Sequence, residues 1–201
     1  MREYWFGEPA TDTEQLKQKV KRWYMGGEAL DREIRQRFTA TVDDALVGGL
    51  VEWEADIRDR VALVIVLDQF PRSVFRGQAE AFDGDDRAQR LVVDALDRGL
   101  DDGLSNEYRN FLCMPLVHAE VLALQDRGMA ELQRLYDGAA DWERPVYAMG
   151  LEQSRKYRDV IARFGRFPHR NPAIGRTSTP DEVDFLSEWK DRQAPRGADK
   201  L

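Results

Sequence analysis

The run Val61-Ala62-Leu63-Val64-Ile65-Val66-Leu67 is apolar at every position and is followed directly by Asp68. A helix that is apolar on all sides has no solvent face, so this run predicts an element at the centre of the molecule. Valine and isoleucine are also typical of buried strands, and a strand is the competing interpretation. The helix is favoured because no partner strand is evident elsewhere in the chain.

The residues before the run extend this central helix. Leu50, Trp53 and Ile57 fall on one helical stripe, so the helix is predicted to cover residues 50–70. Pro71 then removes a backbone donor and is expected to break or kink the element.

The rest of the chain has the same helical character. Amphipathic spacing and end signals predict helices at about residues 11–24, 30–38, 42–47, 85–98, 105–125, 129–136, 142–164 and 179–189. Short connections imply antiparallel neighbours, so the predicted fold is all-α, a single-domain bundle or helix-pair stack of about eight helices. No clean repeat of about 34 residues supports a regular solenoid.

Two helix ends are specified most clearly. Thr179-Pro180-Asp181-Glu182 combines an N-cap, a proline at the first helical position and a glutamate at the third, which predicts a helix start. Gly165 follows Phe164 where a left-handed C-terminal cap is expected.

Length and charge restrict the class of protein. The 201 residues predict one domain over residues 1–201, with residues 192–201 expected to form a frayed polar tail. The 30 Lys and Arg against 37 Asp and Glu give a net charge of −7, which disfavours binding to nucleic acid or to an anionic membrane. The run at 61–67 is too short to span a bilayer.

Cys113 is the single cysteine of the chain. It excludes an intramolecular disulfide and indicates a reducing compartment, so the protein is expected to be cytoplasmic. Its apolar neighbours, Phe111, Leu112 and Met114, favour a buried inert thiol over a catalytic one.

Three segments carry more polarity than their surroundings. In the first, Asp68 follows the apolar run, and a carboxylate there is costly unless it is paired. Arg72 and Arg76 are the local candidates for that pairing. A structural ion pair at the Pro71 break and a ligand site both explain this pattern.

The second segment contains His118 and Glu120. On a continuous helix these two side chains lie about 200° apart, so they cannot hold one small ligand together unless the helix is distorted. His118 would share a face with Leu122. The structural alternatives are a core histidine and a glutamate that bonds a neighbouring helix.

The third segment follows the helix stop at Gly165. Arginine near a helix C-terminus is favourable for the dipole, which accounts for Arg166 alone. It does not account for Arg166, His169, Arg170 and Asn171 together. Arginines grip carboxylate or phosphate bidentately, and histidine exchanges protons near neutral pH. A rigid loop whose arginines pair with Asp68 or Glu120 is the structural alternative.

These segments together resemble the domain-of-unknown-function family 924 (DUF924). The residues that carry the resemblance are Leu67-Asp68-Gln69-Phe70-Pro71-Arg72 with Arg76-Gly77, Pro115-Leu116 with His118 and Glu120, Phe164-Gly165-Arg166-Phe167-Pro168-His169-Arg170-Asn171, Gly175-Arg176 and Thr179. The resemblance spans nearly the whole chain and implies a compact, all-helical, tetratricopeptide-like fold, mostly bacterial. It implies no established reaction, cofactor or substrate.

The chain departs from the family pattern at five positions: Ser73, Ala119, Val121, Leu124 and Tyr157. The family usually has asparagine at the first, serine at the second, acidic residues at the next two and histidine at the last. The positions that change include potential metal ligands and proton carriers. If the family performs acid–base or metal chemistry, this member is expected to have altered it.

We therefore expect an Arg- and His-rich internal pocket for a small anionic molecule, a carboxylate or a phosphate, in a small-molecule enzyme or sensor without a cofactor. The candidate catalytic residues are His118, Glu120, Asp68 and His169. The candidate ligand-binding residues are Gln69, Arg72, Arg76, Tyr157, Arg166, Arg170 and Asn171. A homodimer is possible.

The alternative is a tetratricopeptide-like protein-interaction module in which the polar motifs are structural braces. A metal site ranks third, because the two histidines lack His-x-x-x-His or Glu-x-x-His spacing. No P-loop or other glycine fingerprint favours nucleotide binding, and no nucleophile elbow favours a Ser-His-Asp hydrolase. If every arginine of these segments is paired with a protein carboxylate, the interpretation of the polar motifs as structural braces is favoured.

Overall fold

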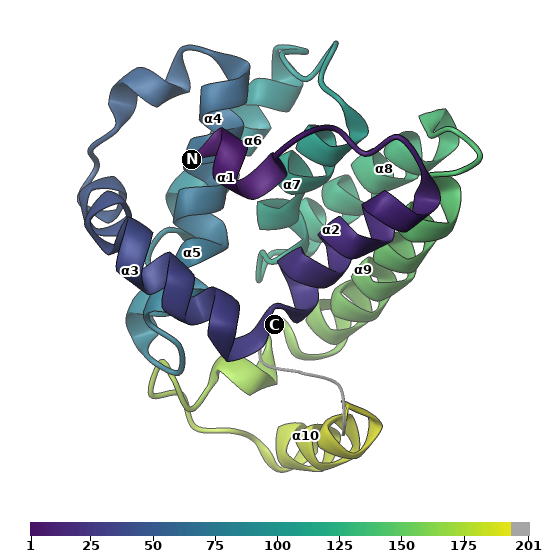
Figure 1. The fold of residues 1–201 in the computed structure, drawn as a ribbon. Coiled ribbons are helices and arrows are strands. Elements are labelled where there is room, and N and C mark those ends of the chain that lie inside the picture. Colours follow the sequence, from purple (N-terminus) through teal and green to yellow (C-terminus); the bar gives the residue numbers. More distant parts are fainter. Residues whose placement is uncertain (194–201) are drawn as a thin grey trace.

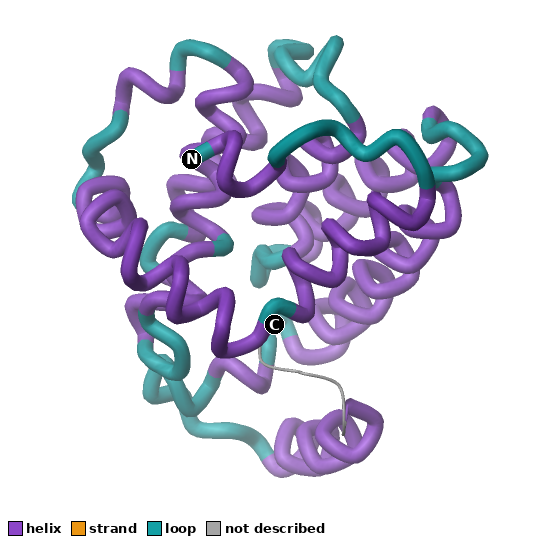
Figure 2. The backbone as a smooth tube through the Cα atoms, viewed as in Figure 1, coloured by secondary structure: helices purple, strands orange, loops and turns teal. Residues whose placement is uncertain are grey.

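The computed structural model describes the backbone of residues 1–193 and the side chains of residues 1–188. This part of the chain is helical, and no strand occurs in it (Figure 2). The α-helices are α1 (Arg2–Phe6), α2 (Thr13–Met25), α3 (Gly27–Leu46), α4 (Ile57–Asp68), α5 (Phe70–Val74), α6 (Asp85–Asp97), α7 (Asn106–Val117), α8 (Leu122–Gly138), α9 (Arg144–Phe164) and α10 (Pro180–Gln193). Three short 3-10 segments are η1 (Val51–Glu54), η2 (Ala79–Phe82) and η3 (Pro168–Arg170).

The all-α, single-domain prediction is confirmed. The predicted frayed tail at residues 192–201 lies outside the described residues, apart from the backbone of its first two positions. None of the described helices is long and apolar enough to cross a membrane.

Helix α4 is the centre of the fold. Each residue from Val61 to Leu67 is at most 1% exposed, because α3, α6 and α7 pack around the helix and α1 also contacts it (Figure 1). The choice of helix over strand for this run is confirmed. Pro71 acts as predicted, since α4 ends at Asp68 and the short α5 begins at Phe70.

Aromatic side chains fill the space between α1, α2 and α7. The centroid of the Trp5 ring lies 5.3 Å from that of Phe70 and 5.4 Å from that of Phe111, both in edge-to-face geometry. The Trp23 indole donates a hydrogen bond of 2.9 Å to the carbonyl of Trp5. This cluster fixes the N-terminal helix against the central layer.

The C-terminal half is a row of three packed helices, α7, α8 and α9, on the side of the molecule opposite α3 (Figure 1). Helix α10 contacts η3, and its Phe185 packs against Phe164 at the end of α9 (Figure 1). The two predicted helix ends are confirmed. Gly165 has φ of 68°, and Glu182 accepts from the Thr179 amide at 2.8 Å while its own amide lies 3.3 Å from the Thr179 hydroxyl.

The predicted helix over 105–125 is wrong. Helix α7 ends at Val117, His118 caps it, and α8 begins at Leu122 after an extended Val121. Consequently His118 and Glu120 are not on one helix, and the expected angle of 200° between them does not apply. The predicted stop before Gly128 and the separate helix at 129–136 are wrong as well, because α8 runs through both.

Other boundaries differ in simpler ways. The helices predicted at 30–38 and 42–47 form one helix, α3. The helix predicted over 50–70 begins only at Ile57, because the Asp56 carboxylate caps α4 by accepting from the amides of Arg58 and Asp59. Asp12 rather than Thr11 caps α2, accepting from the Gln15 amide at 2.9 Å.

Candidate functional site

The three polar segments meet in the interior. Asp68 ends α4, His118 follows α7, and Arg170 closes η3, and all three are linked by hydrogen bonds or ion pairs through at most one further residue. The interruption between α7 and α8 brings His118 to the end of α4. The helix stop at Gly165 turns the third segment back toward them.

Asp68 and His118 form a close pair. The Nδ1 atom of His118 lies 2.9 Å and 3.0 Å from the two carboxylate oxygens of Asp68. The Asp68 side chain is 1% exposed, whereas the His118 side chain is 13% exposed. No hydrogen bond from any described residue reaches Nε2 of His118.

Asp68 is held as a carboxylate. Burial by itself would raise the pKa of this carboxyl, but the charges of His118 and Arg72 lower it, as do hydrogen bonds from His118 and Gln69. The net result is a pKa well below the usual value. An ionised carboxylate beside Nδ1 fixes the orientation of the imidazole ring.

Two arginines share a carboxylate next to this pair. Arg72 lies 2.9 Å from one oxygen of Asp85, and Arg170 lies 3.0 Å from the other. Arg72 also stands 3.4 Å from Asp68 and donates to its backbone carbonyl. Both guanidinium groups lie over the ring of Phe82, with the Cζ atom of Arg72 5.4 Å and that of Arg170 4.6 Å from the ring centroid. Burial and the neighbouring Arg72 lower the pKa of Arg170.

The backbone around His118 is clamped by side chains. The buried Gln125 amide donates to the carbonyls of Val117 at 2.7 Å and Ala119 at 2.8 Å. Arg170 donates to the carbonyl of His118 itself at 2.9 Å. Three consecutive carbonyls at a helix interruption are thereby satisfied without water. These bonds replace the helical ones that the sequence led us to expect.

Glu120 binds two residues at and beyond the third segment, Phe167 and Arg176. It accepts a bidentate pair from Arg176 at 2.6 Å and 2.9 Å and the backbone amide of Phe167 at 2.7 Å. Burial would raise the pKa of Glu120, yet these bonds lower it below its usual value. Arg176 also bonds the carbonyl of Phe167 and the side chain of Asn171.

Glu182 likewise accepts hydrogen bonds from side chains of the third segment. Arg166 binds it bidentately at 2.6 Å and 2.8 Å, and the Asn171 amide donates to it at 3.2 Å. The hydrogen bonds from Arg166 lower the pKa of Glu182 to about 2. Arg166 and Asn171 therefore attach the start of α10 to the third segment.

His169 differs from His118. Burial lowers the pKa of His169 to about 3, and the positive charge of Arg170 lowers it in the same direction. Its ring stands 5.3 Å from Phe167, and no hydrogen bond to it occurs in the described structure. His169 is therefore neutral at physiological pH, which makes it a poor proton carrier.

The remaining candidates lie around these groups. Gln69 donates to Asp68. Arg76 lies farther away and pairs with Asp31 on α3. Tyr157 is buried in a small apolar cluster, with its ring 5.8 Å from Phe167, and burial raises its pKa.

Every arginine of the three segments has a carboxylate partner within the described chain. The partners are Asp85 and Asp68 for Arg72, Asp31 for Arg76, Glu182 for Arg166, Asp85 for Arg170 and Glu120 for Arg176. None of these arginines is free to grip a ligand by itself. The nitrogen of Arg170 that lacks a partner, Nε, is sealed from solvent.

The sequence did not single out Asp85, Asp31 or Glu182 as members of the polar network. Asp85 and Asp31 sit near helix starts rich in charge, where carboxylates are common. Glu182 was identified as a capping residue, and its capping role is real. Their long-range partners are separated by tens of residues, and no local pattern reports that.

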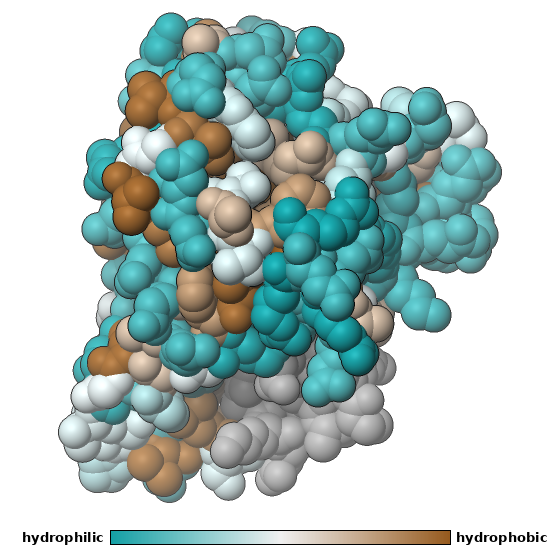
Figure 3. All heavy atoms as spheres, turned by 60° about the vertical axis from the view of Figure 1, so that its left-hand side comes forward, coloured by the Kyte–Doolittle hydropathy of each residue, from teal (hydrophilic) through white to brown (hydrophobic). Residues whose placement is uncertain are grey.

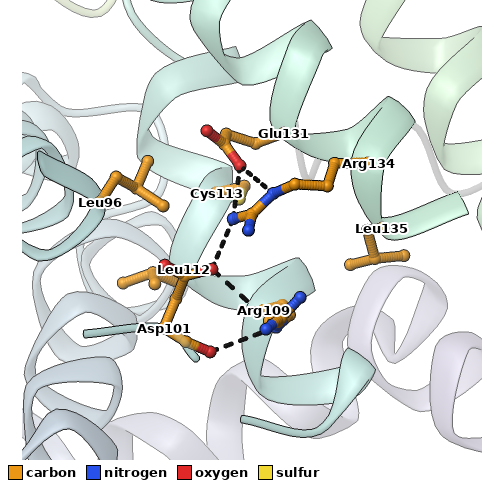
Figure 4. A pocket seen from close by; sticks show the side chains of 8 residues that line it. All are labelled: Leu96, Asp101, Arg109, Leu112, Cys113, Glu131, Arg134 and Leu135. Atoms are coloured by element: carbon orange, nitrogen blue, oxygen red, sulfur yellow. Dashed lines mark hydrogen bonds and ion pairs between the residues drawn. The ribbon is translucent and has the colours of Figure 1, made fainter. Parts of the chain in front are cut away.

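A small pocket of about 10 Å³ lies elsewhere, between α6, α7 and α8 (Figure 4). Its lining residues are Leu96, Asp101, Arg109, Leu112, Cys113, Glu131, Arg134 and Leu135. Arg134 pairs with both Asp101 and Glu131 across it (Figure 4). Burial raises the pKa of the Cys113 thiol to about 12, so the thiol is inert as predicted. No group of three or more potential metal ligands occurs among the described residues.

Comparisons with known proteins place the chain in a family. The family model described as "Bacterial protein of unknown function (DUF924)" matches residues 1–189. A solved structure described as "Structure of Protein of Unknown Function ATU0120 from Agrobacterium tumefaciens" is 34% identical and has a TM-score of 0.74, with 86% of this chain and 92% of that chain covered. No curated protein sequence matches. The chain therefore belongs to the DUF924 family of bacterial proteins.

Proposed function

We propose that the protein is a small-molecule enzyme in which His118, oriented by Asp68, transfers a proton to or from a small anionic substrate. One observation carries this proposal. Nδ1 of His118 faces a buried, ionised carboxylate while Nε2 has no partner in the described chain and the side chain retains some exposure. Most buried polar atoms have a hydrogen-bond partner, so a paired Nδ1 beside an unpaired Nε2 leaves one nitrogen available to a ligand.

The chemistry follows from this asymmetry. Nε2 accepts a proton from the substrate, and the imidazolium that forms is stabilised by Asp68. The same nitrogen returns the proton later in the cycle. Glu120 is bound by Arg176 and by the backbone amide of Phe167, so it braces the third segment rather than exchanging protons. The neutral His169 is a poor proton carrier.

The charge of the cluster supports an anionic substrate. With His118 neutral, Arg72 and Arg170 are balanced by Asp68 and Asp85. Protonation of His118 adds one uncompensated positive charge in a region of low dielectric. A carboxylate or phosphate near Nε2 would neutralise it, and the arginines would act through their field rather than by direct contact.

A screen by thermal shift tests this proposal. Small carboxylates and phosphate esters are added to wild type, to His118→Asn and to Arg127→Gln, whose arginine pairs with Asp97 on the surface. A ligand at one hundred times its Kd stabilises by about 2.7 kcal/mol, which is roughly 5–10 °C for a domain of this size. Wild type and Arg127→Gln should show the shift, and His118→Asn should lose it. Equal shifts in all three proteins would exclude His118 as the binding centre.

A second function has an observation in its favour. If the polar motifs are structural braces, every arginine in them should be paired with a carboxylate, as is observed. This pairing is expected of a tetratricopeptide-like interaction module, in which the motifs only stabilise the fold. If no anion stabilises wild type and His118→Asn only loses stability, this module is the better explanation. In either case we expect a cytoplasmic protein.

A further inference from the structure

The connection between α3 and α4 presents apolar side chains to solvent. Val47 is 85% exposed and Val51 is 60% exposed, while Leu46, Leu50 and Trp53 lie half-buried beneath them. We refer to residues 46–53 as the 46–53 surface. Brown side chains interrupt the teal surface on this side of the molecule, where α3 and its connection to α4 lie (Figure 3).

This surface is held firmly from below. Arg87 on α6 donates to the carbonyls of Ala45 and Gly49, both at 2.8 Å, and pairs with Glu54 at 2.6 Å. Arg60 on α4 donates to the Glu54 carbonyl at 2.7 Å and 2.9 Å. The exposed valines are therefore not the tip of a loose loop but a fixed feature of the fold.

The backbone of the surface is strained as well as anchored. Leu50 has φ of 57°, the one positive value among the described residues other than glycine. A branched residue in this conformation costs about 1 kcal/mol or more. The half-buried Leu50 thus adopts an unfavourable backbone conformation, and the neighbouring Val47 and Val51 expose apolar surface to water.

Negative charge surrounds the apolar centre. Residues 38–57 contain Asp43, Asp44, Glu52, Glu54 and Asp56 but no Lys, Arg or His. Arg87 neutralises Glu54, and Asp56 caps α4. Asp43, Asp44 and Glu52 remain exposed next to Val47 and Val51. Arg87 and Arg60, the two cations bonded to this segment, are engaged with its carbonyls and with Glu54 and Asp94.

We propose that the 46–53 surface is a docking site for a basic amphipathic segment of a partner protein. The apolar side of such a segment would cover Val47 and Val51, and its Lys or Arg residues would meet the carboxylates around them. A second copy of this chain placed face to face would bring like charges together. An anionic membrane would be repelled for the same reason. This inference is independent of the chemistry at His118.

Binding of a model segment tests the proposal. The probe is a fluorescently labelled helical peptide of leucine and lysine, and its affinity is measured by anisotropy. Val47→Ser together with Val51→Ser removes the apolar centre without changing the charge, and both positions are exposed enough to leave folding intact. Met149→Ser on α9 is the matched control, because Met149 is also exposed and apolar.

The double variant should bind the peptide about tenfold more weakly than wild type, while Met149→Ser binds as wild type does. Asp43→Asn with Glu52→Gln should weaken binding several-fold and reduce its dependence on salt. Equal affinity of wild type and the valine variant overturns the proposal. So does an equally tight complex with a serine and lysine peptide of the same charge, since attraction would then be electrostatic only.

Discussion

The two ring nitrogens of His118 stand in different surroundings, and this difference defines the candidate site. Nδ1 is bonded to the buried Asp68, which is itself bonded by Gln69 and lies near Arg72. Nε2 has no described partner. An orienting carboxylate on one side and an open nitrogen on the other is the arrangement used for proton transfer.

Removing the charge of Asp68 should destabilise the protein strongly. In Asp68→Asn, the Arg72 guanidinium loses one of its two counter-charges and His118 loses its partner in the interior, so the free energy of unfolding should fall by about 3 kcal/mol. Urea denaturation measures this loss. Asp97→Asn is the control, because its pair with Arg127 is exposed and is expected to change stability by less than about 1 kcal/mol. Similar losses in both variants would mean that Asp68 is not held as the structure describes.

The low pKa of His169 predicts a pH dependence of stability. The unfolded chain takes a proton on this histidine below about pH 6.5, whereas the folded protein does so only near pH 3. Between these values acid favours the unfolded state, so the stability contributed by neutral His169 is present above pH 6.5 and is lost as the pH falls. The wild-type slope should exceed that of His169→Asn by up to about 1.4 kcal/mol per pH unit. Urea midpoints from pH 4 to pH 7 measure it, and parallel curves for the two proteins would contradict the burial of His169.

The start of α6 approaches the end of α4 closely, next to the candidate site. Gly84 precedes α6 directly, and an added Cβ would overlap the backbone carbonyl of Leu67. This contact lets Asp85 reach Arg72 and Arg170. The absence of a side chain at Gly84 thus allows Asp85 to form ion pairs with two of the three polar segments.

Replacing Gly84 by alanine should therefore cost about 2 kcal/mol or more, because backbone cannot move aside as a side chain can. Gly150 is the matched position, since it lies inside α9 and an added Cβ would meet nothing within 4 Å. Gly150→Ala should stabilise the protein by about 0.5–1 kcal/mol through helix propensity. Thermal unfolding of the two variants decides the matter, and changes of the same sign would refute the close approach of α6 to α4.

The elements differ in how far the sequence predicts them. The central helix was predictable because residues 61–67 are apolar on all sides, and the helix end at Gly165 because only a left-handed cap explains a glycine there. The end of α7 at Val117 was not predictable, because Gln125 and Arg170 stabilise it by bonds formed only in the folded chain.

Over the whole molecule, the sequence identified the three polar segments and the candidate pairing of Asp68 with Arg72, but not the contacts of Asp68 with His118 or of Asp85 with Arg170. Asp68 and His118 are 50 positions apart, and Asp85 and Arg170 are 85 apart, so no local spacing reveals either contact. The expectation of arginines that grip a ligand directly is weakened by their complete pairing. What remains is one buried dyad with an open nitrogen, set in a braced, all-helical domain.

The two histidines make one measurement especially direct. Nitrogen-15 spectra of histidine-labelled protein resolve four ring nitrogens, two from His118 and two from His169. We predict that a titration with the carboxylates and phosphate esters of the thermal screen moves the Nε2 signal of His118, while its Nδ1 keeps the signature of a nitrogen bonded to a carboxylate and His169 stays unchanged. No movement of Nε2 with any of these anions, or movement of His169 alone, would contradict the proposal that His118 is the proton-transfer centre.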